Sequence, residues 1–243
     1  MTALGFLYPG HSAEDDYPRT EQLLGSDIRL TVVHTDTGED AHGVDALLDM
    51  GSERRLAAGV EELRLSGAEA VVWACAGGSF VYGLQGAHEQ VRGLARAAGL
   101  PASSTSFAFA HAAREIAAHR VAIGATYPDD VAALFAAFLK EAGTEVVAVH
   151  GAGDVTGAEV AGWGYDQVLA LARAADRPDA EAVLLPDTAL HTVSHLAALE
   201  KDLAKPVLTA NQVTVWEALR LTDRRVNAPD LGALFTREPI VQA

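Results

Sequence analysis

The chain has 243 residues, enough for one large domain or two smaller ones, and its 49% hydrophobic and 21% charged content is that of an ordinary globular protein. A formal net charge of −15, from 18 basic and 33 acidic residues, argues against nucleic acid or an anionic membrane as a partner, because phosphates bind basic patches. One cysteine cannot form an internal disulfide, no apolar run approaches the roughly 20 residues that span a bilayer, and no signal-peptide pattern is evident, so we expect a cytoplasmic protein.

Short apolar runs alternate along the chain with longer segments of helical periodicity. The runs predict strands at residues 4–8, 29–34, 70–74, 120–125, 145–150, 180–185 and 206–208. Several are continuous in Val, Ile, Leu and Ala, as in strands buried on both faces of a parallel sheet. Helices are predicted at residues 52–65, 88–98 and 129–142. Ser52 is the expected N-cap of the first helix, and Gly99 and Gly143 are expected to end the other two.

An internal repeat runs through this pattern. GAEAVVWACAGGSF (67–80) and DAEAVLLPDTALHT (179–192) both read as a turn, a strand and a loop, and each leads through a helix to a strand that begins with proline. Upstream, LGFLYPG (4–10) matches VAIGATYPDD (121–130). The common order of these matches indicates a duplicated unit.

The repeat predicts the domain organisation. We expect an α/β fold of two pseudo-symmetric α/β halves with parallel sheets, at residues 1–115 and 116–220, whose elements can interleave, followed by a C-terminal tail at 221–243. Ligands of open α/β sheets bind outside the carboxyl ends of the strands. An active-site cleft is therefore expected between the halves.

The single cysteine, Cys75, follows a predicted strand and precedes Ala76, Gly77, Gly78 and Ser79. Small residues allow the backbone to approach a ligand, and their N–H groups with the next helix N-terminus form an anion site. The same positive end lowers the pKa of a neighbouring thiol. We interpret Cys75 as a nucleophile or proton-transfer base beside a carboxylate-binding loop; the alternative is a buried structural cysteine.

Asp187 takes the position of Cys75 in the second half and is followed by Thr188 and Ala189. One interpretation is a general acid or base across the cleft, with Thr188 or the N–H groups after it holding a substrate oxygen. The other is an N-cap of the next helix. Both interpretations stay open.

Two tyrosines, Tyr8 and Tyr127, occupy equivalent positions of the repeat, and each precedes a proline. We expect both phenols to donate hydrogen bonds into the cleft. His191 and His195 are spaced for a zinc pair if they lie on a helix, but no third ligand is evident. The glycine-rich run at 151–157 lacks the acidic residue of a nucleotide site. We therefore expect no metal and no cofactor.

At these residues the chain resembles the aspartate/glutamate racemase superfamily, most closely the branch of maleate cis–trans isomerases and arylmalonate decarboxylases, over residues 4–220. The first-half family motif has the shape of ACAGGSF around Cys75, and Tyr127 matches a tyrosine that contacts the substrate carboxylate. The second-half motif places a cysteine where this chain has Asp187. The resemblance implies two α/β halves and chemistry without cofactor or metal.

The resemblance implies a function as well. In the isomerases the first-half cysteine adds to the alkene, the new single bond rotates, and elimination gives the trans acid. We therefore expect a cofactor-independent isomerase of a small (di)carboxylate, maleate-like, with Cys75 as nucleophile or base and Asp187 as acid/base partner.

Two other functions stay open. The first is a single-thiol decarboxylase or racemase of malonate- or amino-acid-type substrates; the decarboxylases carry their cysteine in the second half, so Cys75 would stand on the opposite face. The second is a non-catalytic carboxylate-binding protein. A homodimer or higher homo-oligomer is expected from the frequency of such assemblies.

Overall fold

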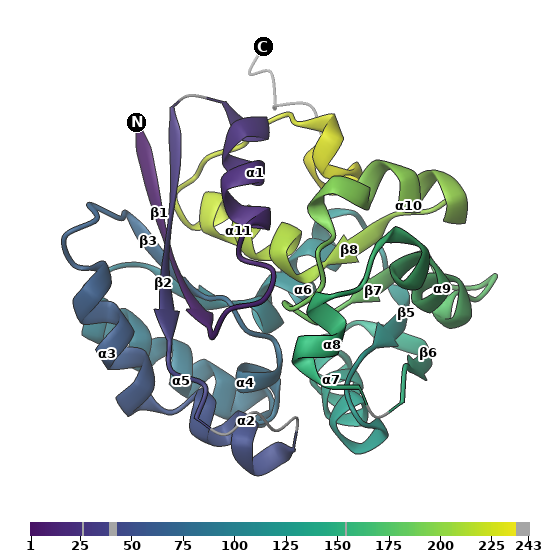
Figure 1. Ribbon diagram of the computed structural model, residues 1–243, viewed down its shortest axis with the longest axis horizontal. Coiled ribbons are helices and arrows are strands. Elements are labelled where there is room, and N and C mark those ends of the chain that lie inside the picture. The colour runs from purple at the N-terminus through teal and green to yellow at the C-terminus, as the bar shows by residue number, and fades with distance from the viewer. Residues whose placement is uncertain (26, 39–42, 154, 237–243) are drawn as a thin grey trace.

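The computed structural model describes residues 1–25, 27–38, 43–153 and 155–236 of the chain (Figure 1). Strands and helices alternate along these residues, and the strands form two four-stranded sheets in which neighbours run parallel. The predicted α/β fold with parallel sheets is therefore confirmed.

The strands divide evenly between the two sheets, and each half of the chain supplies one sheet with its helices. The first half contains β1 (Thr2–Pro9), α1 (Asp16–Leu24), β2 (Ile28–Thr35), α2 (Val44–Met50), α3 (Glu53–Leu63), β3 (Ala70–Trp73), α4 (Gly77–Phe80), α5 (Gly83–Ala98), β4 (Ala102–Ser104) and α6 (Thr105–Glu115). The second contains β5 (Arg120–Ala125), α7 (Asp129–Glu141), β6 (Glu145–Gly151), α8 (Gly157–Ala161), α9 (Tyr165–Ala175), β7 (Ala182–Leu185), α10 (Leu196–Leu203), β8 (Val207–Thr209) and α11 (Ala210–Leu221). Short 3₁₀ turns are η1 (Val193–His195), η2 (Pro229–Leu231) and η3 (Ala233–Phe235).

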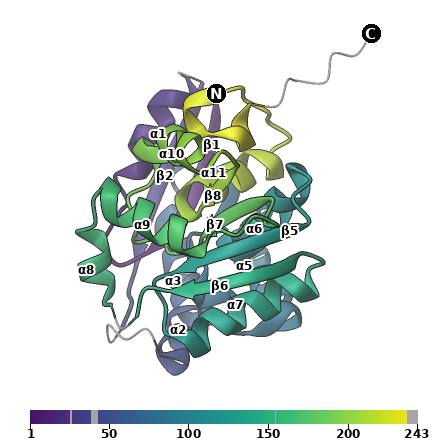
Figure 2. The same cartoon turned by 90° about the vertical axis from the view of Figure 1, so that its right-hand side faces the viewer.

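Both sheets have the same strand order, β2-β1-β3-β4 and β6-β5-β7-β8. The inner strands β3 and β7 are buried along their whole length, which explains their unbroken apolar runs. The edge strands β2 and β6 are only partly buried. Figure 2 shows the second sheet, with β6 at its edge beside α7. The carboxyl ends of β3 and β7 thus hold equivalent places in the two sheets.

The helix boundaries follow the capping residues in part. Gly99 and Gly143 have φ values of 65° and 93°, and each follows the end of its helix as predicted. Ser52 stands at the N-cap of α3, but its side chain makes no capping hydrogen bond. The helix predicted at 88–98 begins five residues earlier, at Gly83, where glycine and glutamine hide the apolar period.

The two halves share one apolar core. Aromatic rings from the first half meet rings from the second: Phe80 lies 5.7 Å from Tyr127 and 5.2 Å from Phe135, measured between ring centroids. Phe107 lies 5.4 Å from Phe138, and their planes cross at 66°. Burial of such rings is the main favourable term in folding. The relative position of the halves is therefore fixed by packing rather than by a flexible linker.

Helices α6 and α11, which follow the last strand of each half, pack against each other, and α11 also contacts β3 and β4 of the first sheet. Polar groups are buried at this contact. Glu217 is fully buried and accepts hydrogen bonds from Ser103 at 2.7 Å and Arg220 at 2.7 Å, with His111 at 3.0 Å. The second half therefore interleaves with the first.

The tail continues this packing. Leu231, Leu234 and Phe235 are buried in the core, and Gln212 of α11 donates a hydrogen bond to the Leu231 carbonyl at 2.7 Å. The apolar patch of the tail thus covers its own chain.

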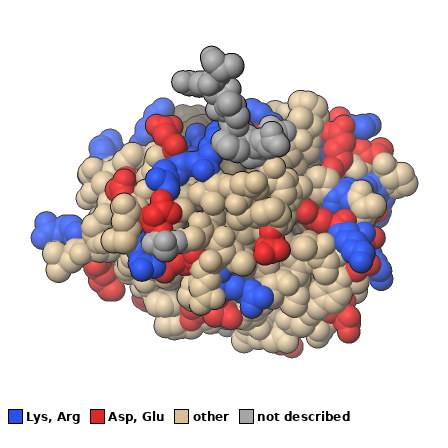
Figure 3. Space-filling model, turned by 90° about the horizontal axis from the view of Figure 1, so that it is seen from above, with Lys and Arg blue, Asp and Glu red and all other residues tan. Residues whose placement is uncertain are grey.

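Charges are mixed on the surface of the protein. On the face seen in Figure 3, basic and acidic side chains alternate, and no continuous basic patch interrupts them. In the described part of the chain, every helix is too short or too polar to cross a membrane.

Glu217 predicts an acid-sensitive contribution to stability. Burial alone would raise the pKa of Glu217, but Arg220 and His111 outweigh burial and lower the pKa to about 2. A carboxyl with a depressed folded pKa stabilises the protein above its unfolded pKa of about 4.3, and this stabilisation is lost as pH falls towards 2. We expect Glu217→Gln to lower the free energy of unfolding by about 3 kcal/mol at pH 7, measured by urea denaturation.

The matched control is Glu181→Gln, which removes a solvent-facing partner of Arg120 and should lower the free energy of unfolding far less than Glu217→Gln does. The deficit of Glu217→Gln should shrink as the pH falls from 5 towards 2, because the carboxyl of the unfolded chain takes up a proton near pH 4.3 whereas the native carboxyl stays ionised down to about pH 2. A deficit that stays constant over this range would contradict the assignment.

Candidate active site

A cavity of about 250 Å³ lies at the carboxyl ends of strands from both sheets. Its first-half lining consists of Pro9, Gly10, His11, Ser12, Thr37, Leu47, Met50, Cys75 and Gly77. Its second-half lining consists of Tyr127, Gly157, Ala158, Asp187, Thr188 and Ala189. Hollows of about 380 and 350 Å³ lie elsewhere, but neither meets these strand ends. The structure thus places Cys75 and Asp187 in one cavity.

Cys75 lies two residues beyond the end of β3 and is 5% exposed. The Gly78 N–H donates a hydrogen bond to Cys75 Sγ over 3.2 Å, and Met50 Sδ lies 3.9 Å from the same sulfur. Burial raises the pKa of the Cys75 thiol to about 12, and the negative charge of Asp187 contributes to the rise. The N–H groups of Gly78 and Gly77 lower the pKa, but by less than burial raises it. The expected low pKa is therefore corrected: the thiol of the free protein is neutral at pH 7.

The small residues after Cys75 do not all face the cavity. Of the four predicted to bind substrate, Gly77 lines the cavity, whereas Ala76, Gly78 and Ser79 do not. The N–H of Ser79 donates to the Ala76 carbonyl at 3.0 Å, and its hydroxyl bonds to Ser104 at 2.8 Å. The sequence predicts that this loop binds an anion, but its N–H groups instead form the first turn of α4 and a hydrogen bond to the Cys75 sulfur.

Glycine at position 78 fits this close packing better than a residue with a side chain would. A Cβ there would lie 3.1 Å from a ring carbon of Trp73 and 3.3 Å from Cys75 Sγ. A side chain would press on the Cys75 thiol and displace the Gly78 N–H that donates a hydrogen bond to the sulfur. Gly78 therefore holds the thiol in place rather than contacting a ligand.

Asp187 lies two residues beyond β7, the position that Cys75 holds after β3. Both carboxylate oxygens are held: Thr126 Oγ1 donates to Oδ2, and the Ala189 N–H donates to Oδ1 at 2.8 Å. No helix begins at this point in the described chain, so the interpretation as an N-cap is wrong. The hydrogen bonds orient the carboxylate at the wall of the cavity, and Asp187 is 6% exposed there.

The two tyrosines have different roles despite their equivalent positions. Tyr127 lies beyond the end of β5, lines the cavity and donates a hydrogen bond to the Pro186 carbonyl at 3.2 Å. Burial, with the charges of Asp187 and Cys75, raises the pKa of Tyr127 well above its ordinary value. The phenol therefore stays protonated and able to donate.

Tyr8 lies within β1, is fully buried and does not line the cavity. Its hydroxyl donates to the Thr188 carbonyl at 2.7 Å and accepts the Ala13 N–H at 3.0 Å. The prediction that Tyr8 binds substrate is corrected, because its hydroxyl is already occupied. Tyr8 instead joins a first-half strand to the loop that carries Asp187.

Several lining residues were not predicted. Leu47 and Met50 reach the cavity from α2, and Gly157 and Ala158 from the first turn of α8. The T-x-x-E pattern at 156–159 signals the start of α8, where the structure forms a capping box. No sequence pattern indicates that α2 or α8 would reach the cavity. In the glycine-rich run, residue 154 lies outside the described residues.

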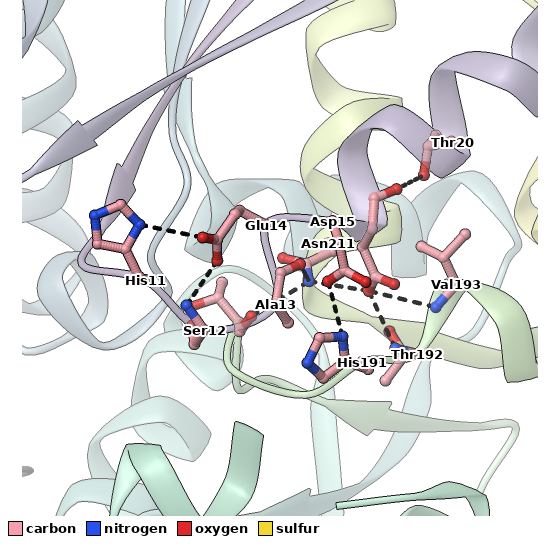
Figure 4. Close-up of polar contacts among 12 residues, drawn as sticks. His11, Ser12, Ala13, Glu14, Asp15, Thr20, His191, Thr192, Val193 and Asn211 are labelled. Atoms are coloured by element: carbon pink, nitrogen blue, oxygen red, sulfur yellow. Dashed lines mark hydrogen bonds and ion pairs between the residues drawn. The ribbon is translucent and has the colours of Figure 1, made fainter. Parts of the chain in front are cut away.

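The two histidines whose spacing would suit a zinc pair on a helix lie apart in their contacts. His191 lies in a loop with Nδ1 2.9 Å from Asp15, as Figure 4 shows, and the ring of His195 lies 5.3 Å from that of Tyr165. The two histidines do not share a helical face, so they do not offer a zinc pair.

A cavity between two parallel α/β halves, with a cysteine from one half and its counterpart from the other, defines the Asp/Glu racemase-like superfamily. The family model of arylmalonate decarboxylase matches residues 41–235. The chain therefore belongs to the arylmalonate decarboxylase family, which confirms the resemblance of the sequence to this branch.

Known proteins agree with this assignment. The arylmalonate decarboxylase of Bordetella bronchiseptica is 32% identical over 143 residues, 57% of this chain, and the chain spans 59% of the length of that relative. Maleate cis–trans isomerase of Nocardia farcinica, solved with a covalently bound succinylcysteine intermediate, has a TM-score of 0.88 at 20% identity and covers 98% of this chain and 99% of its own.

A liganded double mutant of arylmalonate decarboxylase, with one glycine changed to cysteine and one cysteine to serine, has a TM-score of 0.81 at 24% identity over 97% of this chain and 99% of that chain. These structural likenesses establish the shared fold.

The buried thiol predicts an unusual reactivity profile. Because burial holds the pKa of Cys75 at about 12, alkylation by iodoacetamide should accelerate about tenfold per pH unit from pH 7 to 10 without a plateau. Asp187→Asn should react faster at each pH, since it removes a neighbouring negative charge. Intact mass reports the adduct without ambiguity, because the chain has one cysteine. The control Asp230→Asn, at an exposed site, should leave the profile unchanged. A plateau below pH 8 would show that the thiolate forms readily.

Proposed function

We propose that the protein is a cofactor-independent decarboxylase of small α-substituted malonates, with Cys75 as the proton donor. The observation that supports it is the Cys75 thiol, which is neutral, buried and on the wall of the cavity opposite Asp187. A neutral thiol is suited to give a proton to a carbanion, whereas a nucleophilic role needs the thiolate. Membership of the arylmalonate decarboxylase family supports the same reaction.

The reaction proceeds in two steps. The bond from the α-carbon to one carboxylate breaks, carbon dioxide leaves, and the electron pair spreads onto the remaining carboxylate as an enediolate. The proton of Cys75 Sγ then moves to the α-carbon, and the thiolate left behind takes a proton from water. The Gly78 N–H, 3.2 Å from the sulfur, stabilises the transient thiolate.

The cavity wall supports this assignment of roles. Pro9, Leu47, Met50 and Ala158 give the cavity apolar surface for the α substituent and for a carboxylate that leaves as neutral carbon dioxide. The N–H of Gly77 can donate to the carboxylate that remains, and Tyr127 can do so if its hydroxyl turns from the Pro186 carbonyl to the substrate.

A cis–trans isomerase of maleate-type acids is the second candidate, and the Gly78 N–H aimed at Cys75 Sγ favours it. In that reaction the thiolate adds to one alkene carbon, and the π electrons move to the other carbon and take up a proton. After rotation about the new single bond, that carbon gives up a proton, the C–S bond breaks, and the trans alkene and the thiolate are released. The donor that stabilises a transient thiolate serves this reaction equally well. A covalent adduct of maleate on Cys75, seen by intact mass, would distinguish the isomerase from the decarboxylase.

If the protein is a decarboxylase, its turnover should depend strictly on the proton of the Cys75 thiol. We expect release of carbon dioxide from phenylmalonate, and a loss of at least about 100-fold in kcat for Cys75→Ala, because general acid catalysis contributes that much or more. Cys75→Ala should still bind the acid, seen as a rise in Tm with malonate. Conversion of maleate to fumarate without carbon dioxide release would replace this proposal by the isomerase. A rise in Tm with no turnover in the unmodified protein would indicate a binding protein.

The position of the thiol predicts the stereochemistry. Cys75 approaches the α-carbon from the first half, whereas the resemblance places the cysteine of the decarboxylases in the second half. A malonate with methyl and phenyl substituents should therefore give one enantiomer in excess, opposite to that from the Bordetella bronchiseptica enzyme. Chiral chromatography of the two products in parallel measures this. The same enantiomer from both enzymes, or a racemate, would mean that Cys75 does not deliver the proton.

A further inference from the structure

Three potential metal ligands lie together beside the cavity, outside the catalytic pair. They are His11 and Glu14, which follow β1, and His34, near the carboxyl end of β2. One ligand atom from each lies within 4.8 Å of the others, the one such group of three in the described part of the chain. The two imidazole rings are stacked, with centroids 3.9 Å apart. Two strand ends of one sheet therefore bring these side chains to one point.

Backbone groups orient two of the three ligands. His34 Nδ1 lies 2.7 Å from the Gly10 carbonyl, so Nδ1 carries the proton and Nε2 keeps its lone pair. Glu14 accepts the Ser12 N–H at 2.7 Å on Oε2, while Oε1 lies 3.1 Å from His11 Nδ1. Figure 4 shows Glu14 between His11 and Ser12. Metal-binding histidines and carboxylates are commonly held by such outer hydrogen bonds.

The three side chains are of the types that bind transition metals. Two imidazoles and one carboxylate form a ligand set of catalytic zinc sites and of other divalent transition-metal sites, which keep an open position for water or substrate.

The geometry permits closure on an ion. Ligand atoms held at about 2.0–2.1 Å in a tetrahedral site lie roughly 3.4 Å apart, so the group must close by at most about 1.5 Å. Stacked rings direct their lone pairs side by side, so His11 must turn off the His34 ring for both to bind one ion. The His11 side chain is 72% exposed, so solvent leaves room for that rotation.

We propose that His11, Glu14 and His34 form a binding site for a divalent transition-metal ion, with Zn²⁺ as the best match, at the edge of the catalytic cavity. His11 itself lines that cavity. The described lining includes Asp187 but neither lysine nor arginine, so a bound dication would change the charge beside the cavity without being required for the reaction. This consequence rests on the proposed function, whereas metal binding itself does not.

The test uses the full chain with Cys75→Ser, which removes the thiol as a competing ligand and makes metal binding independent of turnover. Calorimetric titration with Zn²⁺ should show one equivalent bound with a micromolar or lower Kd. Titration with Co²⁺ should give visible absorption bands of an ion bound by nitrogen and oxygen. His11→Ala and Glu14→Gln should each weaken binding at least tenfold, and saturating Zn²⁺ should raise Tm.

The matched control is His150→Ala, which removes a histidine from the end of the edge strand of the other sheet and should leave the affinity unchanged. His11→Ala cannot fail through misfolding, because that side chain is largely exposed. Absence of saturable binding, or binding that survives both His11→Ala and Glu14→Gln, would overturn the proposal and leave the group an ordinary surface ion pair.

Discussion

A buried hydrogen-bond network between the loops after β1 and β7 fixes the geometry on which the site depends (Figure 4). Tyr8 donates to the Thr188 carbonyl at 2.7 Å, and Asn211 Nδ2 donates to the same carbonyl at 3.2 Å and to Asp16 at 3.1 Å. Asp16 also accepts the Thr192 N–H at 3.0 Å. Each group is shielded from water, so leaving one unpaired would cost about 1–3 kcal/mol. The second-half loop is thereby held against the first half at the point where the cavity forms.

This fixed arrangement explains the electrostatics of the cavity. Cys75 has little contact with water, and Asp187 is turned towards the cavity by Thr126 and the Ala189 N–H. A thiolate there would lose hydration and stand near a carboxylate, and the N–H groups of Gly78 and Gly77 do not offset both effects. The proton therefore stays on sulfur in the free protein, as the proposed role of Cys75 as a proton donor requires.

The sequence predicts the parts of the structure that depend on local patterns. Unbroken apolar runs locate the strands, and the repeat places Cys75 and Asp187 at equivalent strand ends, because two copies of one plan carry equivalent positions to equivalent places. The same symmetry misleads for Tyr8, whose hydroxyl is occupied by the nearby Ala13 N–H and by the carbonyl of Thr188, far away in the chain. The pKa of Cys75 is likewise not readable from its neighbours in sequence, because burial by distant elements decides it. Leu47 reaches the cavity through tertiary packing that no local period encodes.

The repeat also shows how a symmetrical scaffold can support a one-directional reaction. Removing a proton on one face and returning it on the other requires two groups of similar proton affinity. Here the two equivalent places hold different groups, a neutral thiol at Cys75 and a hydrogen-bonded carboxylate at Asp187, so they are not a matched pair. A single proton transfer from one face needs no such match, provided that another step supplies the driving force. Loss of carbon dioxide is a step of that kind, and it needs one donor on one side only.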